Sequence, residues 1–358
     1  MKLAVIGAGN GGAAAAVELS LAGHDVALYA RSADTIAPFK RDGIRHLGVF
    51  GEGVVRPALL STNMAEATRD AEAAIICLPT FAHVDVARAL HSANWDVSLP
   101  VILNPGHTGG AFEFEAAYRS LAAKAPPIAE FATLAYIARK PASNTVSITG
   151  RAKSLRAAAL PGAGDALRLA CDLFPGAYDS GDVIACDLSN INMVVHPPGA
   201  ILGAAWVEAT GGDFTFYVQG MTPGVIEIMR ALDDERMTVG KAFGHDLPSV
   251  IEEMKAVGTV PADADSRDYA AIAVGEANRR IKAPDSLSHR YYMEDFGHGL
   301  VPFLAYARVA KVEVPVASAL TKLGLTATAK RGAMVLRTAA TMGFEGWSLS
   351  RLLQRAKG

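Results

Sequence analysis

The stretch LAVIGAGNGG (residues 3–12) decides the fold of the first half of this chain. An apolar strand pattern runs into Gly7, Gly9 and Gly12 at the G-x-G-x-x-G spacing, and an Ala-rich helical pattern follows. The first glycine permits a tight turn, the second lets the backbone approach a pyrophosphate, and the third lets helix and strand pack closely. A glycine-rich turn without a ligand is the alternative, but the strand-loop-helix context favours a dinucleotide site. Its candidate residues are Gly7, Gly9, Asn10, Gly11 and Gly12.

Outward from this stretch, short apolar runs alternate with helical patterns as far as residue 187. Continuous apolar runs separated by helices indicate a parallel sheet that is covered on both faces. The fold class is therefore α/β, with an N-terminal Rossmann-type, doubly wound parallel sheet. Strands are predicted over 2–6, 25–29, 73–78, 101–103, 131–138, 145–149 and GDVIACD (181–187), and helices over 12–21 and between Gly162 and Pro175.

From residue 188 onward strand patterns are scarce and long helical patterns replace them. The chain has 358 residues, more than one hydrophobic core usually serves. We therefore predict a dinucleotide-binding domain over 1–187 and a mainly α-helical, substrate-binding domain over 188–358. Helices are predicted over 188–195, 201–209, 223–243, 248–256, 269–281 and 301–309.

Composition limits the partners. The net charge is −2 and the basic residues are dispersed, so nucleic acid is not an expected partner. No apolar stretch reaches membrane-spanning length and the start lacks a signal-peptide pattern, so a membrane is not expected either. The three cysteines are odd in number and lack metal-ligand spacing, which indicates the cytoplasm and no metal site. The expected partners are small-molecule substrates, and a homodimer is left open.

The residues at the end of the second predicted strand indicate whether the cofactor is NAD or NADP. An NAD site usually has an acid there, bound to the ribose 2′-hydroxyl. In HDVALYARSAD (24–34) that position is Ala30, and Arg31 and Ser32 follow it. These two residues suit a 2′-phosphate, so NADP is favoured over NAD. The alternative is that Arg31 is a solvated loop residue.

Two further loops follow predicted strands at the edge where such sheets bind ligands. CLPTFAH (77–83) contributes Pro79 and Thr80 as candidate cofactor residues. NPGHTGG (104–110) contains glycines that allow close approach to a cofactor or an oxoacid. Both can alternatively be ordinary βα turns.

NMVVHPPGAI (192–201) supplies the candidate proton donor. His196 sits on an apolar run and two prolines follow it, which we expect to end or kink the helix and fix the ring toward a cleft. Hydride transfer to a carbonyl or imine needs a proton donor tuned near neutrality, and histidine is suited to that role. A satisfied core histidine is the alternative. Asn192, one turn earlier, is a candidate to contact substrate or cofactor or to brace the loop.

SHRYYMEDFGHGLVP (288–302) holds the candidate partners of His196, and its glycines and proline suggest a loop between helices. Arg290 can clamp a substrate carboxylate with two hydrogen bonds. Either Glu294 or Asp295 can orient the imidazole, and spacing alone does not choose between them. The alternative for each is a surface ion pair.

The chain resembles the opine dehydrogenase family, which includes octopine and nopaline dehydrogenases, over nearly its whole length. The combination of the Asn/His-Pro stretch and the FxFYxxGxTP run is not a general feature of dinucleotide-binding proteins. The resemblance is carried by GAGNGG (7–12), LNPGHTGGAFEF (103–114), NINMVVHPPGAI (190–201), GGDFTFYVQGMTPGVIEIMRALDDERMTVGKAFG (211–244) and HRYYMEDFGHGLVP (289–302).

This resemblance implies an NAD(P)H-dependent reductive condensation of an amino acid with a 2-oxoacid such as pyruvate, and a helical domain of the 6-phosphogluconate dehydrogenase C-terminal type. It implies that His196 is catalytic, that Asp295 is its partner and that Arg290 binds a carboxylate. The family position that contacts the oxoacid falls on His107. Since the family uses either cofactor, NADP rests on Arg31 and Ser32, and the amino acid stays open because 256–285 is less recognisable.

Two other functions remain open. One is a 2-oxoacid reductase or hydroxy-acid dehydrogenase of the ketopantoate reductase or glycerol-3-phosphate dehydrogenase type. Such enzymes are expected to place a lysine at the chemistry, and the motifs around His196 and Asp295 contain none. The other is a non-enzymatic NAD(P)-binding sensor, which would have no reason to retain a His, Asp and Arg set.

Overall fold

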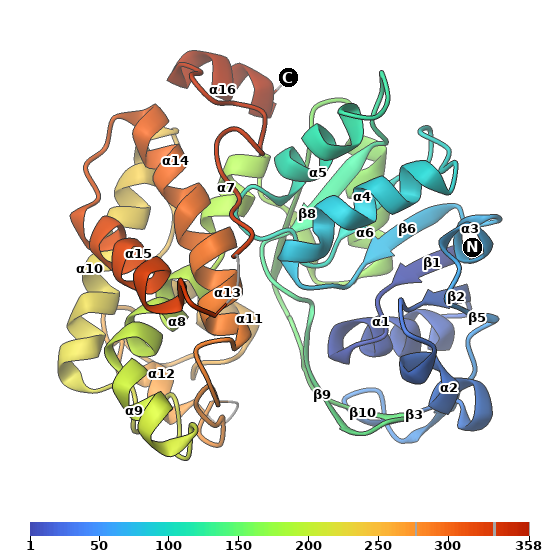
Figure 1. Ribbon diagram of the computed structural model, residues 1–358, viewed down its shortest axis with the longest axis horizontal. Coiled ribbons are helices and arrows are strands. Elements are labelled where there is room, and N and C mark those ends of the chain that lie inside the picture. The colour runs from blue at the N-terminus through green and yellow to red at the C-terminus, as the bar shows by residue number, and fades with distance from the viewer. Residues whose placement is uncertain (276–277, 332–333, 358) are drawn as a thin grey trace. The chain divides into compact units, whose positions relative to one another are not determined.

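The computed structural model describes residues 1–275, 278–331 and 334–357. The chain divides into two compact units (Figure 1). Unit 1 comprises Met1–Gly106 and Gly110–Val183, and unit 2 comprises His107–Gly109 and Ile184–Lys357. The domain boundary predicted at 187/188 thus lies close to the division at 183/184. The short segment His107–Gly109, which belongs to unit 2, was not anticipated.

Unit 1 is built on an eight-stranded sheet with the order β12-β11-β8-β7-β6-β1-β2-β5. Neighbouring strands run parallel except that β11 is antiparallel to β8. The central strands are buried on both faces, as expected of a sheet covered by helices on each side. The predicted α/β class with a parallel sheet is confirmed. The strands are β1 (Lys2–Ile6), β2 (Asp25–Tyr29), β5 (Leu59–Ser61), β6 (Ala73–Ile76), β7 (Val101–Leu103), β8 (Ile128–Phe131), β11 (Leu155–Ala159) and β12 (Ala177–Asp179).

The helices of unit 1 follow the strands in the alternating pattern of this fold. Strands β6, β1 and β2 are parallel neighbours, so their carboxyl ends, with the loops that follow them, share one edge of the sheet. The helical segments are α1 (Asn10–Leu21), α2 (Ala33–Asp42), α3 (Met64–Thr68), η1 (Thr80–Ala82), α4 (His83–Ser92), α5 (Gly110–Arg119) and α6 (Gly164–Leu173).

A second, four-stranded sheet in unit 1 has the order β4-β3-β10-β9. The strand predicted over 131–138 is therefore wrong in part, because β8 ends at Phe131 and the next strand begins in the second sheet. The strands of this sheet are β3 (Ile44–Gly48), β4 (Gly53–Val55), β9 (Tyr136–Ala142) and β10 (Thr145–Arg151).

Unit 2 is helical, as predicted (Figure 1). The strand predicted over 181–187 is wrong, because this segment forms most of a short helix. Residues 182–190 are all buried. A helix that is buried on every side has no polar face, so its sequence lacks the helical alternation of polar and apolar residues. The helices are α7 (Val183–Leu188), α8 (Asn192–Leu202), α9 (Ala204–Thr210), α10 (Pro223–Ala242), α11 (Val250–Val257), α12 (Ala271–Val274), α13 (Arg290–Asp295), η2 (Phe296–Leu300, a π-helix), α14 (Val301–Ala310), α15 (Pro315–Thr328) and α16 (Leu349–Lys357).

The prolines after His196 do not end the helix, which corrects one part of the prediction that they end or kink it. Helix α8 continues through Pro197 and Pro198 to Leu202. A proline fixes φ near the helical value, but beyond the first turn it removes an N–H donor to the carbonyl four residues earlier. Here α8 begins only at Asn192, and the prolines remove N–H groups that would bond to its first turn. The helix predicted over 188–195 is accordingly divided between α7 and α8.

The stretch predicted over 288–302 as a loop between helices is helical from Arg290 onward. Helices α13, η2 and α14 follow one another without interruption from Arg290 to Ala310. A Cβ on Gly299 would lie 2.8 Å from the Cβ of Met193, so this glycine serves close packing of η2 on α8. The helix predicted over 269–281 is much shorter, since α12 ends at Val274, and residues 276–277 lie outside the described residues.

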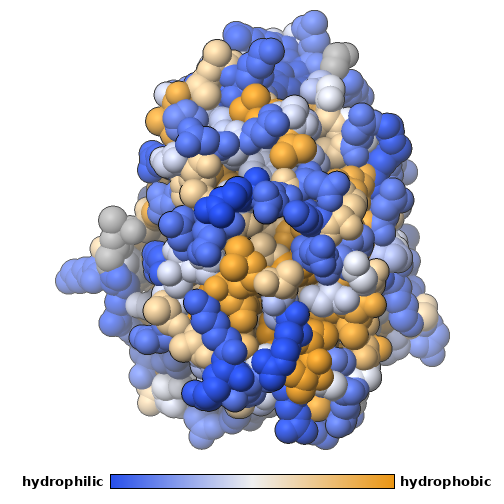
Figure 2. Space-filling view, turned by 90° about the vertical axis from the view of Figure 1, so that its right-hand side faces the viewer, coloured by the Kyte–Doolittle hydropathy of each residue, from blue (hydrophilic) through white to orange (hydrophobic). Residues whose placement is uncertain are grey.

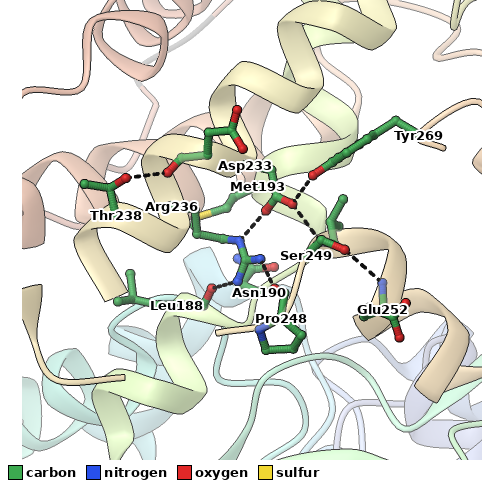
Figure 3. Close-up of polar contacts among 12 residues, drawn as sticks. Leu188, Asn190, Met193, Asp233, Arg236, Thr238, Pro248, Ser249, Glu252 and Tyr269 are labelled. Carbon is green, nitrogen blue, oxygen red and sulfur yellow. Dashed lines mark hydrogen bonds and ion pairs between the residues drawn. The ribbon is translucent and has the colours of Figure 1, made fainter. Parts of the chain in front are cut away.

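A buried polar cluster on α10 ties several segments of unit 2 together (Figure 3). Asp233 Oδ1 accepts from Arg236 Nε at 2.6 Å, and its Oδ2 accepts from Val250 N at 2.7 Å and from the Tyr269 hydroxyl at 2.6 Å. Arg236 also donates to the carbonyls of Leu188 and Pro248, at 3.0 and 2.6 Å. Every polar group named here thus has a partner, as burial requires.

One face of the surface is mainly hydrophilic. Figure 2 views the face at the right of Figure 1, where hydrophilic residues cover most of the surface and apolar ones show between them in the lower half. No helix among the described residues is long and apolar enough to cross a membrane.

Candidate active site

His196 and Asp295 form a buried pair in unit 2. His196 lies on α8 and Asp295 ends α13, and their side chains meet with Nδ1 to Oδ2 at 2.7 Å. The two residues are 5% and 3% exposed. A histidine held by a carboxylate through one ring nitrogen keeps the other nitrogen available for proton transfer. The structure therefore brings together the two residues that the sequence proposed as the dyad.

Aromatic side chains enclose the rest of the imidazole. The Nε2 atom lies 3.0 Å from the hydroxyl of Tyr217, and the ring of Tyr291 stacks on His196 with centroids 3.8 Å apart. Phe216 meets the ring edge-on at 6.0 Å. The Tyr217 hydroxyl is also hydrogen-bonded to Tyr291. None of these three aromatic residues was predicted as a site residue, although they lie in the FTFY and RYYMED runs that carry the family resemblance.

Burial controls the charge of the dyad. It lowers the pKa of His196 well below the ordinary value, and the nearby Arg290 charge lowers it further. It raises the pKa of Asp295 well above the ordinary value, assisted by the charge of Glu294. Both shifts favour a pair that is neutral as a whole, with a proton retained between Oδ2 and Nδ1. Such a pair is an acid that can release one proton.

Arg290 begins α13 and is exposed. Its guanidinium lies 5.8 Å from the ring of Tyr291. Within the described ranges it makes neither a hydrogen bond nor an ion pair, although it is close enough to Glu294, Asp295 and Tyr217 to interact with their charges. An unpaired guanidinium beside the dyad is suited to a carboxylate of the substrate.

His107 is placed near the dyad by the three-residue segment that joins unit 2. It is buried, has a positive φ of 57°, and its Nδ1 lies 4.0 Å from Glu294 Oε1. Burial lowers the pKa of His107. The segment is held by Arg337, which donates to the carbonyl of Thr108 at 2.8 Å. A non-glycine residue in this backbone region is uncommon and is often found at functional sites.

Asn192 is the first residue of α8, one turn before His196, and is half-buried. Its backbone N–H donates to Asn190 Oδ1 at 3.2 Å. Its side chain makes no hydrogen bond within the described part of the chain, so it is available for a ligand.

The glycine loop in unit 1 fits a dinucleotide. A Cβ on Gly12 would lie 1.7 Å from the carbonyl oxygen of Gly7, so only glycine permits this approach of helix to turn. Gly9 is exposed with open space around its Cα, and Asn10 beside it is exposed. Gly9 caps α1 without a side-chain hydrogen bond, so the first N–H groups of the helix are not capped by a side chain. These groups are the donors that would hold a pyrophosphate.

The end of β2 lacks an acid, as the sequence indicated. Ala30 is buried, whereas Arg31 and Ser32 are exposed, and Ser32 precedes α2. A cation that the sequence reasoning missed lies close by along the glycine loop. Lys140 of β9 donates to the carbonyl oxygen of Ala8 at 3.4 Å and lies 4.4 Å from the centroid of the Phe39 ring on α2.

The loop after β6 places its two candidates differently. Pro79 is exposed just before η1, whereas Thr80 is fully buried.

Comparison with known proteins agrees with this division of the chain. Residues 179–328 match the family model of the NAD/NADP octopine/nopaline dehydrogenase α-helical domain, and residues 3–98 match that of ketopantoate reductase PanE/ApbA. The opine dehydrogenase of Arthrobacter sp. (strain 1C) is 33% identical over 324 residues, which cover 89% of each chain. The chain belongs to the opine dehydrogenase family. It is therefore an NAD(P)-dependent dehydrogenase, and the resemblance drawn from the motifs is confirmed.

Solved structures show the same fold as this opine dehydrogenase. Octopine dehydrogenase in complex with NADH and L-arginine has a TM-score of 0.77 at 22% identity, covering 99% of this chain and 98% of that one. Yersinopine dehydrogenase with bound NADP+ has a TM-score of 0.73 at 16% identity, covering 100% and 98%. The predicted order of a parallel-sheet domain followed by a helical domain is thus shared by both.

Proposed function

We propose that this opine dehydrogenase joins the amino group of an amino acid to a 2-oxoacid such as pyruvate, using NADPH and the dyad of His196 and Asp295. The observation that carries the proposal is the buried contact of 2.7 Å between His196 Nδ1 and Asp295 Oδ2, with an unpaired Arg290 beside it. Loss of water from a carbinolamine needs an acid, and this pair holds a proton to give. In this proposal unit 1 binds the cofactor and unit 2 the substrates.

Each remaining candidate has a role in this reaction. Arg290 binds the carboxylate of the oxoacid with its planar fork of donors. His107, next to Glu294, contacts the oxoacid, and Asn192 contributes an amide to substrate binding. The neutral amine of the amino acid attacks the carbonyl carbon, and the dyad protonates the departing hydroxyl. When bound, the nicotinamide supplies the hydride that reduces the C=N bond.

The preference for NADPH rests on the cations of unit 1. An acid at the end of β2 would repel a 2′-phosphate, and Ala30 stands in its place with Arg31 and Ser32 following. Lys140 adds a second cation at Ala8, inside the glycine loop. Among related proteins both cofactors are found, since octopine dehydrogenase was solved with NADH and yersinopine dehydrogenase with NADP+.

The substrate classes are supported by what the relatives bind. Octopine dehydrogenase was solved with L-arginine and, separately, with pyruvate. An amino acid and a 2-oxoacid each carry a carboxylate, which suits the free guanidinium of Arg290. The proposal places the enzyme in the cytoplasm, in keeping with free Cys77, Cys171 and Cys186.

A panel assay tests the proposal. The purified protein is mixed with NADPH, with pyruvate or another 2-oxoacid, and with each proteinogenic amino acid in turn, and cofactor oxidation is followed. We expect oxidation only when oxoacid and amino acid are both present, and a product whose mass is that of the secondary amine. His196→Gln is the matched inactive control. Oxidation that proceeds without any amine would instead establish the simple 2-oxoacid reductase.

That simple reductase is favoured by one observation, the ketopantoate reductase match over residues 3–98. This match lies wholly in unit 1, which binds the cofactor, and does not reach the dyad. The stretches around His196 and Asp295 contain no lysine, the residue expected at the chemistry of that class. We therefore prefer the reductive condensation to the simple reduction of a 2-oxoacid.

A further inference from the structure

The imidazole of His196 is enclosed on every side that matters for proton transfer. Its Nδ1 atom is occupied by Asp295 at 2.7 Å and its Nε2 atom by the Tyr217 hydroxyl at 3.0 Å. One face of the ring is covered by Tyr291 and the residue is 5% exposed. In this arrangement a proton on Nε2 meets the oxygen of Tyr217 before it can meet any substrate.

We propose that the hydroxyl of Tyr217 hands the proton to the substrate, and that His196 and Asp295 act behind it as its proton supply. This inference rests on the proposed condensation and deepens it. Tyr217 is close enough to Arg290 for their charges to interact. A carboxylate bound to Arg290 would therefore bring the adjoining carbon, which carries the departing hydroxyl, toward Tyr217.

The step balances as a transfer of one proton through three groups. The C–O bond of the carbinolamine breaks, and the leaving oxygen takes the hydroxyl proton of Tyr217 and departs as water. The Tyr217 oxygen takes the Nε2 proton of His196, and Nδ1 of His196 takes the proton held by Asp295. The nitrogen lone pair of the substrate becomes the C=N bond. The products are an iminium cation, water and a carboxylate at Asp295, which solvent reprotonates before the next turnover.

The electrostatics agree with this order. Burial raises the pKa of Tyr217 well above that of a free phenol, so its hydroxyl is protonated at neutral pH. A buried tyrosinate would be costly in free energy. His196 must therefore donate its Nε2 proton to Tyr217 in the same step in which Tyr217 gives up its own. Tyr291, whose ring stacks on the imidazole, interacts with the Tyr217 hydroxyl as well and adds to the effect of burial in raising the pKa of Tyr217.

The test compares two phenol-to-benzene changes in unit 2. Tyr217→Phe removes the proposed donor and keeps the ring beside Phe216. Tyr292→Phe is the matched control, because Tyr292 is also buried and its hydroxyl donates to the backbone carbonyl of Ala200 at 2.7 Å and not to His196. Both are assayed with NADPH, pyruvate and the amino acid that the wild-type enzyme turns over fastest.

For Tyr217→Phe we expect kcat to fall about 10²–10⁴-fold with both KM values within about threefold of wild type. The rate in mixtures of light and heavy water should change from a curved to a linear dependence on deuterium fraction, since fewer protons then move together. Adding His196→Gln should cost little more, because the groups act as one unit. Tyr292→Phe should match wild type in all three measurements.

Three results would overturn the relay. One is a Tyr217→Phe enzyme within about threefold of wild-type kcat, and another is a loss confined to KM. The third is an equal loss in Tyr292→Phe, which would mean a structural effect. If Tyr217→Phe does not fold, 3,5-difluorotyrosine at position 217 keeps the shape with a more acidic phenol and must move the pH profile of kcat. If the wild-type enzyme shows no amine-dependent oxidation, the proposed function itself has failed and the relay fails with it.

Discussion

At the scale of single residues, burial is the main control on the charge of the proposed dyad. Burial disfavours the imidazolium of His196 and the carboxylate of Asp295 alike, so the pair keeps a shared proton. The pKa of the pair therefore depends on the charges near it. One prediction below concerns the two residues themselves, and the next concerns the neighbouring charge of Glu294.

The first prediction concerns the pair as a unit. His196→Gln should lower the rate about 10²–10⁴-fold, because it removes the group that holds the proton while keeping similar volume. Asp295→Asn should also slow the reaction, because an amide cannot supply a proton to Nδ1 as a carboxylic acid does. The double variant should be about as slow as His196→Gln alone, as measured by kcat under saturating substrates. Losses that simply add would show that the two residues act independently.

The second prediction uses Glu294. Its negative charge raises the pKa of Asp295, second to burial, and it also raises that of His196. The proposed reaction needs the protonated pair, so we expect activity to be lost as pH rises through the pKa of the pair. Glu294→Gln removes the charge and lowers that pKa, so the alkaline limb of kcat/KM for pyruvate should move to lower pH. Glu227→Gln, at an exposed ion pair on α10, is the control and should leave the limb in place. A limb that stays or moves to higher pH in Glu294→Gln would contradict the assignment.

At the scale of elements, the sequence predicted what local patterns determine. Strands β1, β2 and β7 and helix α10 were located almost to the residue, because buried apolar runs and the Thr222-Pro223 start mark their ends. The segments around the dyad were misjudged for the opposite reason. There are two prolines in α8 and two glycines in η2, and judged by local preference alone these residues break helices. Tertiary packing overrides that preference, as the close approach of Gly299 to Met193 illustrates.

The contrast between local sequence patterns and tertiary contacts also applies to the candidate site. His196 and Arg290 were predicted because their residue types suit proton transfer and carboxylate binding, whereas the choice of Asp295 over Glu294 came from the family resemblance. Tyr217 was missed because a tyrosine among aromatic residues reads as core, and only its contact of 3.0 Å with Nε2 distinguishes it. Lys140 was missed because it comes from β9, far in sequence from the glycine loop that it contacts.

The third prediction belongs to helix α10, whose buried pair joins it to α11 and to the end of α7 (Figure 3). Asp233→Ala leaves Arg236 buried without its carboxylate, and breaking such a pair typically costs about 3–5 kcal/mol of unfolding free energy. Chemical denaturation measures this loss. Arg230→Ala on the same helix is the matched control, because its ion pairs are exposed and should contribute little. Equal destabilisation by both changes would show that the buried cluster does not hold the helix.

At the scale of the whole molecule, the chain divides into two compact units, and the proposed function gives each a different task. The family models match on the same plan, with residues 3–98 in unit 1 and residues 179–328 almost entirely in unit 2. The one feature out of sequence order is His107–Gly109. These residues follow a strand of unit 1, so their sequence resembles an ordinary βα loop. Their long-range contacts, among them those with Glu294, Arg337 and Asp187, lie in unit 2.

The last prediction tests that division through the cofactor. Arg31→Ala and Lys140→Met should each weaken NADPH binding by about 1.5–3 kcal/mol and leave NADH nearly unaffected, because a charge-assisted contact to the 2′-phosphate is lost. Lys2→Met is the control, since Lys2 begins β1 at the end away from the glycine loop. His196→Gln should bind NADPH as wild type does, because the dyad belongs to unit 2 and the glycine loop to unit 1. Titration of each variant with both cofactors measures this. If Lys140→Met weakens the binding of NADPH and NADH equally, the lysine contacts a part of the cofactor that both share. If the wild-type enzyme prefers NADH, neither cation binds a 2′-phosphate.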